Sequence, residues 1–86
     1  MSQNDCFSES NFTKAVAYLE NKTPYKIDNF TLRIFEGSIV FDGEKGELLG
    51  SISREQGVIP VVISGYGDIL ERMNGVFCTL VDQSNQ

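Results

Sequence analysis

The chain contains no histidine and no tryptophan among its 86 residues. Histidine is the commonest general base near neutral pH and a frequent zinc ligand, so its absence excludes the usual serine and cysteine triads and most zinc sites. We therefore favour a protein that is not an enzyme, and we predict no catalytic residue, no metal site and no cofactor.

The sequence also lacks a long apolar run and an excess of basic residues. No stretch approaches the roughly 20 apolar residues that a membrane-spanning helix needs, and the start of the chain is polar, without the hydrophobic region of a signal peptide. The chain has 12 acidic and 7 basic residues, spread along its length, and a formal charge of −5. Such a charge does not suit a surface that follows nucleic-acid phosphates. We expect neither a membrane nor a nucleic acid as partner, and we predict a cytoplasmic location.

Cysteine is scarce, because Cys6 and Cys78 are the two in the chain. Two cysteines so far apart match neither a disulfide-rich scaffold nor a zinc-binding motif. Since cytoplasmic proteins keep their thiols reduced, we predict that both are free. Cys78 alternates with Val76 and Leu80, which predicts a small core residue on a strand.

The clearest periodic pattern in the chain is a β-hairpin between residues 30 and 41. Apolar residues recur at every second position on both sides of Glu36 and Gly37, and a glycine in a two-residue loop can take a positive φ. With these two residues as the loop, Leu32 lies opposite Phe41 and Arg33 points to the other face. The conformational entropy lost when the hairpin becomes ordered outweighs the free energy gained when its apolar side chains are buried. The hairpin therefore needs a partner element.

That partner is predicted to be a helix over residues 8–22. Phe12, Val16 and Leu19 recur at helical spacing, and a serine can cap the start. Pro24 ends the helix because the residue before a proline is disfavoured in helical conformation. The alternation then slips by one position near Asp28, which predicts a bulge or a turn there.

Further elements are predicted after the hairpin. Strands are predicted at residues 47–53, 58–63 and 76–81, and a short helix at residues 68–74. Pro60 places the second of these strands at an edge or a bulge, because proline has no backbone N–H. Asp68 and Glu71 have the spacing of a capping box, and Gly75 is a helix stop.

Together these elements predict an α+β fold in one small domain, residues 1–86. The predicted order is one helix, four strands, a second helix and a last strand. The N-terminal helix packs on a mostly antiparallel, curved sheet. The polar ends, about residues 1–7 and 82–86, are predicted to fray.

The second face of the sheet is the strongest candidate for a function. Phe35 and Val40 are out of phase with the core residues, and residues 58–63 are apolar on both faces, whereas one helix covers only one face. A chain this short also gains stability from self-association. We predict a non-enzymatic interaction module that acts as a homodimer on a protein partner. The predicted interface residues are Phe35, Val40, Ile59, Val61 and Ile63.

The alternative is a small-ligand-binding domain or weak enzyme, with a pocket between the sheet and the loop around Tyr66. Its predicted ligand-binding residues are Tyr66 and Asp68. This segment leads from a strand into a helix, where backbone amides can bind an anion, but Asp68 already places a negative charge there. The segment also lacks the pattern of a phosphate-binding loop, so we favour a structural turn. A third alternative, an acidic mimic of nucleic acid, requires carboxylates gathered on one face.

Overall fold

The computed structural model describes residues 6–55, 57–63 and 67–85 of the chain. In chain order the elements are α1 (Glu9–Leu19), β1 (Tyr25–Ile27), β2 (Phe30–Phe35), β3 (Ser38–Asp42), β4 (Leu48–Ser53), β5 (Ile59–Val62) and α2 (Ile69–Ser84). The five strands form one antiparallel sheet in sequence order, with β1 at one edge and β5 at the other. These elements confirm the predicted α+β class, with an N-terminal helix and an antiparallel sheet.

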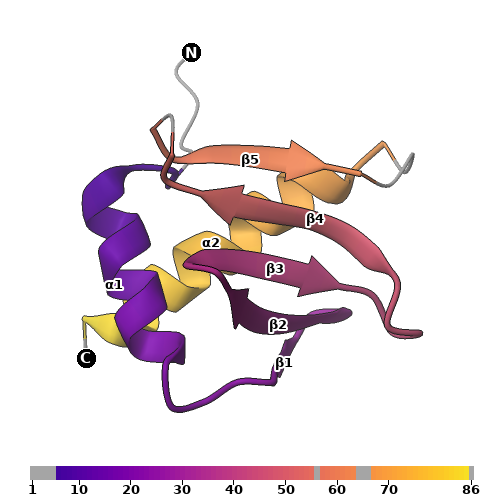
Figure 1. Ribbon diagram of the computed structural model, residues 1–86, viewed down its shortest axis with the longest axis horizontal. Coiled ribbons are helices and arrows are strands. Elements are labelled where there is room, and N and C mark those ends of the chain that lie inside the picture. The colour runs from indigo at the N-terminus through magenta and orange to yellow at the C-terminus, as the bar shows by residue number, and fades with distance from the viewer. Residues whose placement is uncertain (1–5, 56, 64–66, 86) are drawn as a thin grey trace.

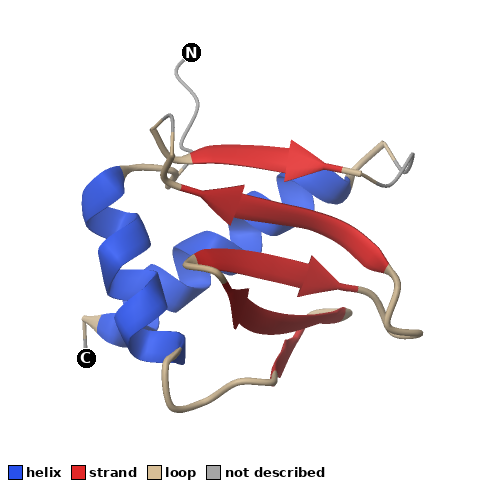
Figure 2. Cartoon of the chain, viewed as in Figure 1, coloured by secondary structure: helices blue, strands red, loops and turns tan. Residues whose placement is uncertain are grey.

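The helices and the sheet form two layers. Helix α2 crosses one face of the sheet, and α1 packs against α2 beside the loop between β2 and β3 and the end of β4 (Figure 1). The opposite face, turned toward the viewer in Figure 2, carries no helix in the described part of the chain. The hydrophobic core therefore lies between the sheet and the two helices.

The central hairpin has the predicted register. Leu32 pairs with Phe41, and the loop residues Glu36 and Gly37 have φ angles of 52° and 81°. Leu32 and Phe41 are buried, whereas Arg33 is exposed. The hairpin therefore has a two-residue loop, and its two faces are those that the alternation predicts.

The core is closely packed against the middle of the sheet. Its largest fully buried side chains are Phe12, Phe30, Phe41, Phe77, Leu19, Leu32, Ile39, Ile52, Ile69, Met73 and Leu80. Phe30 and Phe41 meet edge to face with ring centroids 5.2 Å apart, a favoured arrangement for aromatic rings. A Cβ atom on Gly50 would lie 2.6 Å from the Val61 carbonyl oxygen and 2.9 Å from the Met73 sulfur. This position therefore has no room for a side chain.

The predicted first helix is confirmed except for its end, because α1 ends at Leu19 instead of residue 22, several positions before Pro24. The turn predicted near Asp28 is confirmed. Helix α1 begins after Ser8, whose side chain accepts a hydrogen bond from Asn11 N at 3.2 Å. Phe12 and Leu19 lie on the buried side of the helix. Asp28, with a φ of 57°, lies in the turn between β1 and β2.

The structure corrects the C-terminal element: α2 is one helix where a short helix and a last strand are predicted. Its buried residues recur at helical spacing and are Ile69, Met73, Val76, Phe77, Leu80 and Val81. Val76 and Leu80 lie four positions apart, a spacing that suits one face of a helix as well as one face of a strand. Gly75 is exposed, and a helix tolerates an exposed glycine at modest cost. Asp68 takes the N-cap position without a side-chain capping hydrogen bond, and α2 continues to Ser84, into the end predicted to fray.

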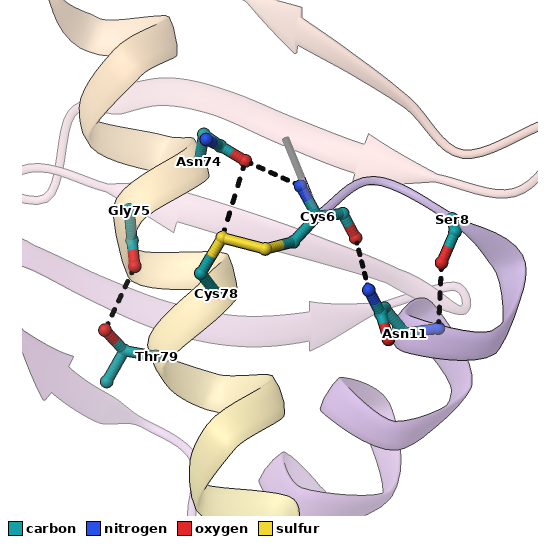
Figure 3. Close-up of a disulfide and its surroundings, with 7 residues drawn as sticks. All are labelled: Cys6, Ser8, Asn11, Asn74, Gly75, Cys78 and Thr79. Carbon is teal, nitrogen blue, oxygen red and sulfur yellow. Dashed lines mark hydrogen bonds between the residues drawn. A yellow bond between two sulfur atoms is a disulfide. The ribbon is translucent and has the colours of Figure 1, made fainter. Parts of the chain in front are cut away.

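The prediction of two free thiols is wrong, because Cys6 and Cys78 form a disulfide with Cα atoms 5.5 Å apart. The strand prediction places Cys78 inside the sheet, but in α2 its side chain reaches the segment before α1 (Figure 3). Asn74 Oδ1 accepts a hydrogen bond from Cys6 N at 2.9 Å, and Asn11 Nδ2 donates to the Cys6 carbonyl at 3.0 Å. Two asparagine side chains therefore hold the backbone of Cys6 beside the disulfide.

Candidate interaction surface

We define the open face as the side of the sheet turned away from α2. Successive strand residues alternate between the two faces, so the neighbours of buried residues point to the open face. Its exposed apolar side chains are Phe35 at 55%, Leu48 at 45%, Ile59 at 46%, Val61 at 50% and Ile63 at 57%. They belong to β2, β4, β5 and the residue after β5. Exposed apolar side chains therefore stand at the β2 end of the face and along β5 with the start of β4, with serines and the Arg33–Asp42 pair between them. All but one of these apolar residues are in the predicted interface.

Val40, the remaining predicted interface residue, lies on the open face but is only 6% exposed. It stands between Arg33 of β2 and Ser51 of β4 in one cross-strand row. Together with Phe35 and Leu48, these residues line a groove of about 400 Å³. Val40 therefore belongs to the floor of this groove and does not project from the face.

Sequence alternation does not predict that Leu48 points outward. Strict alternation along β4 places Leu48 in the core and Leu49 on the open face. The pairing of β3 and β4 shifts between Phe41 and Asp42, and this bulge turns Leu48 outward while Leu49 is buried. Gly50 is the signal that could have indicated the bulge, because an isolated glycine inside a strand often marks one.

The central charges of the open face are paired. Arg33 Nε donates a hydrogen bond to Asp42 Oδ2 at 2.7 Å, and this bond raises the pKa of the Arg33 guanidinium above its ordinary value. The guanidinium carbon also lies 5.8 Å from the centre of the Phe35 ring. Glu36 and Glu55 lie at the border of the groove. A second protein can therefore cover the middle of the face without burying an unpaired charge.

A second hollow, a groove of about 660 Å³, lies between β5 and α2, with Pro60 and Leu70 among its lining residues. Tyr66, a predicted ligand-binding residue, lies outside the described residues. Asp68 is exposed at the start of α2 and does not line this groove. Within the described ranges, no group of three or more acidic or cysteine side chains is placed to hold a metal ion. The ligand site at Tyr66 and Asp68 stays a prediction.

Comparison of the chain with protein-family models, with curated proteins and with solved structures gives no match. In the part of the chain that the structure covers, neither helix is long and apolar enough to cross a membrane. The function of this chain has therefore to be inferred from its own surfaces.

Proposed function

We propose that this protein is a non-enzymatic interaction module that forms a homodimer through the open face and binds a protein partner. The observation that carries the proposal is the exposure of large apolar side chains across one face of the sheet. Burial of apolar surface contributes about 25 cal/mol per Å², and large exposed apolar patches mark interaction sites. In a two-fold dimer, the same patch on each copy covers the other.

The outline of the molecule sets an upper limit on the area of the open face. The molecule measures 36 by 30 Å across its two longer dimensions, and α1 and the loops occupy part of this outline beside the sheet (Figure 1). An ellipse with these axes has an area of about 850 Å², compared with about 800 Å² per partner in a standard interface. The chain is also small, so the core behind the sheet buries only a modest share of the surface. Association through the open face adds to this burial.

Contact between faces suits this sheet better than pairing of edge strands. Strand β5 forms one edge, and Pro60 within it lacks the N–H that a continuous ladder needs. Strand β1, at the other edge, is only three residues long, and short edge strands resist pairing with another chain. We therefore place the dimer contact on the open face.

Light scattering on a size-exclusion column at micromolar concentration tests the dimer. We expect twice the mass of one chain for the wild type, and one copy for Val61→Asp or Phe35→Asp, because either change places a charge in the apolar patch. Asn21→Asp adds the same charge at an exposed position after α1 and should leave the dimer intact. A monomeric wild type at this concentration would rule out the homodimer and leave the open face to a foreign partner.

The disulfide counts against the predicted cytoplasmic location. Cytoplasmic reductants keep most thiols reduced, so the bond between Cys6 and Cys78 favours an oxidising compartment. Labelling with a maleimide at the moment of cell lysis, followed by intact-mass measurement, distinguishes the two locations. An unlabelled protein supports the oxidising compartment, and two labels per chain support the cytoplasm.

A further inference from the structure

The groove between β5 and α2 is lined mostly by apolar side chains. Its apolar lining residues are Phe7, Val58, Ile59, Pro60 and Leu70. The Phe7 ring packs on Phe77 of α2 with centroids 5.3 Å apart, and the disulfide fixes the neighbouring Cys6 to the same helix. One wall is therefore built by α2 and the segment attached to it, and the other by the edge strand.

The backbone of β5 can accept another strand along this groove. In the described residues, β5 pairs with β4 on one side only. Ile63 N donates to Leu49 O at 2.9 Å, and such bonds alternate along an antiparallel strand, so the main-chain groups of Pro60 and Val62 point away from β4. The outer edge therefore presents the Pro60 carbonyl and the Val62 N–H, which can bond to one residue of an added strand. The proline keeps that added strand short.

The charge around the groove favours a basic occupant. Glu71 is the charged side chain among the described lining residues, and Asp68 is exposed three positions before it. Arg72 is turned to another part of the molecule, where its Nε lies 3.4 Å from Asp28 Oδ2 and its guanidinium lies over the Phe30 ring. The chain as a whole carries a charge of −5. Opposite charges on the two partners speed association and exclude unsuitable ligands.

We propose that the groove binds an extended peptide segment of a partner protein, with an apolar side chain against Phe7 and Leu70 and a lysine or arginine beside Glu71. The backbone of this segment bonds to the Pro60 carbonyl and the Val62 N–H. The inference rests on the proposed function, because it names the kind of partner that the interaction module binds. The groove shares Ile59 with the open face, whereas Phe35 and Val61 of the open face do not line it. Variants at Val61 and at Leu70 therefore test the two surfaces separately.

The probe is a phage-displayed library of random eight-residue peptides, selected on the immobilised, disulfide-bonded protein. We expect enriched peptides to carry lysine or arginine next to an aliphatic or aromatic residue. A synthetic copy of one such peptide, followed by fluorescence anisotropy, should bind Leu70→Asp and Glu71→Lys at least about tenfold more weakly than the wild type. Leu70 is 48% exposed, so its replacement leaves the core intact. Asp82→Lys makes the same charge change near the other end of α2 and should leave binding unchanged.

A second selection, on Glu71→Lys, tests the charge preference directly. The enriched peptides should change from basic to acidic, which loss of stability alone cannot produce. The proposal fails if the wild type enriches no peptide, or if the selected peptides bind both groove variants as tightly as the wild type. Val61→Asp separates the groove from the dimer. Undiminished peptide binding to this variant supports the groove whatever the oligomeric state, whereas loss of binding assigns the peptides to the open face and rules the groove out.

Discussion

The two faces of the sheet are built from the same strands and carry similar apolar side chains, yet they end in different environments. On the covered face, Leu32 and Phe41 are 0% exposed, whereas on the open face Phe35 and Val61 are at least half exposed. The alternation along each strand determines which residues share a face. The position of the helices then determines which face becomes the core.

The faces also differ in polar content. No polar or charged side chain is buried among the described residues, whereas the open face carries the ion pair of Arg33 with Asp42 and the serines Ser51 and Ser53 of β4. A surface that mixes apolar and polar groups in this way is typical of interfaces between proteins that also exist apart. The open face therefore differs from the core in its chemistry as well as in its exposure.

The largest difference between the faces should appear on truncation of apolar side chains. Leu32→Ala should lower the free energy of unfolding by about 2–5 kcal/mol, because it leaves a cavity in the core. Val61→Ala should change it by about 0.5 kcal/mol or less in the monomer, because Val61 is an exposed side chain away from the core. Urea unfolding measures both changes, at a protein concentration below the dissociation constant of the dimer. Equal losses of stability would show that the two faces are equally well packed.

The disulfide lies on the covered side, where it joins α2 to the segment before α1. The double variant Cys6→Ser/Cys78→Ser should lower the free energy of unfolding by about 2–4 kcal/mol, because the bond closes a long loop and restricts the unfolded chain. Wild-type protein in reductant is the matched control and should lose a similar amount. If the double variant unfolds at the same urea concentration as the oxidised wild type, the contacts of the asparagines alone hold the N-terminal segment.

The close approach of sheet and helix at Gly50 gives a smaller effect. Gly50→Ala should cost about 1–3 kcal/mol, because the new methyl group meets the Val61 carbonyl and the Met73 side chain. Gly75→Ala is the control, since a Cβ there has no neighbour within 4 Å, and it should stabilise α2 by about 0.8–1 kcal/mol. Thermal unfolding of both variants measures these two effects. A loss of stability for Gly50→Ala, with a gain for Gly75→Ala, would show that the covered face is tightly packed against α2, in contrast to the open face.

The smallest effect is expected for the ion pair on the open face. Arg33→Ala should lower the stability only slightly, and less than Gly50→Ala does, because the Arg33 side chain is partly exposed and solvent screens the pair. The loss should shrink in high salt. A larger and salt-independent loss would mean that this part of the open face is as well shielded from water as the core.

The sequence predicts the parts of the fold that depend on residues close together in the chain. The hairpin loop at Glu36 and Gly37, the start of α1 at Ser8 and the turn at Asp28 each follow from local spacing and turn chemistry. The edge position of β5 follows from Pro60, which lacks a backbone donor. The residues of the two sheet faces follow from the same alternation, although the interface itself stays a prediction.

The structure differs from the prediction where one spacing fits both a helix and a strand, or where a contact joins residues that are far apart in the sequence. The spacing of Val76 and Leu80 fits a strand as well as a helix, and only packing against the core selects α2. The disulfide joins residues 72 positions apart, and no local pattern records such a contact. The outward position of Leu48 depends on a bulge in the pairing of two strands, which alternation within one strand cannot reveal.

The bond between Cys6 and Cys78 also has a mechanical consequence. A force applied to the chain outside the two cysteines passes through the sulfur atoms and leaves the enclosed stretch, 72 positions from end to end, without tension. At about 3.4 Å per extended residue, roughly 240 Å of contour length is shielded in this way. All five strands lie within the shielded stretch. A molecular motor that pulls on one end of the chain would therefore meet the sheet as a single unit that it cannot unravel strand by strand until the disulfide is reduced.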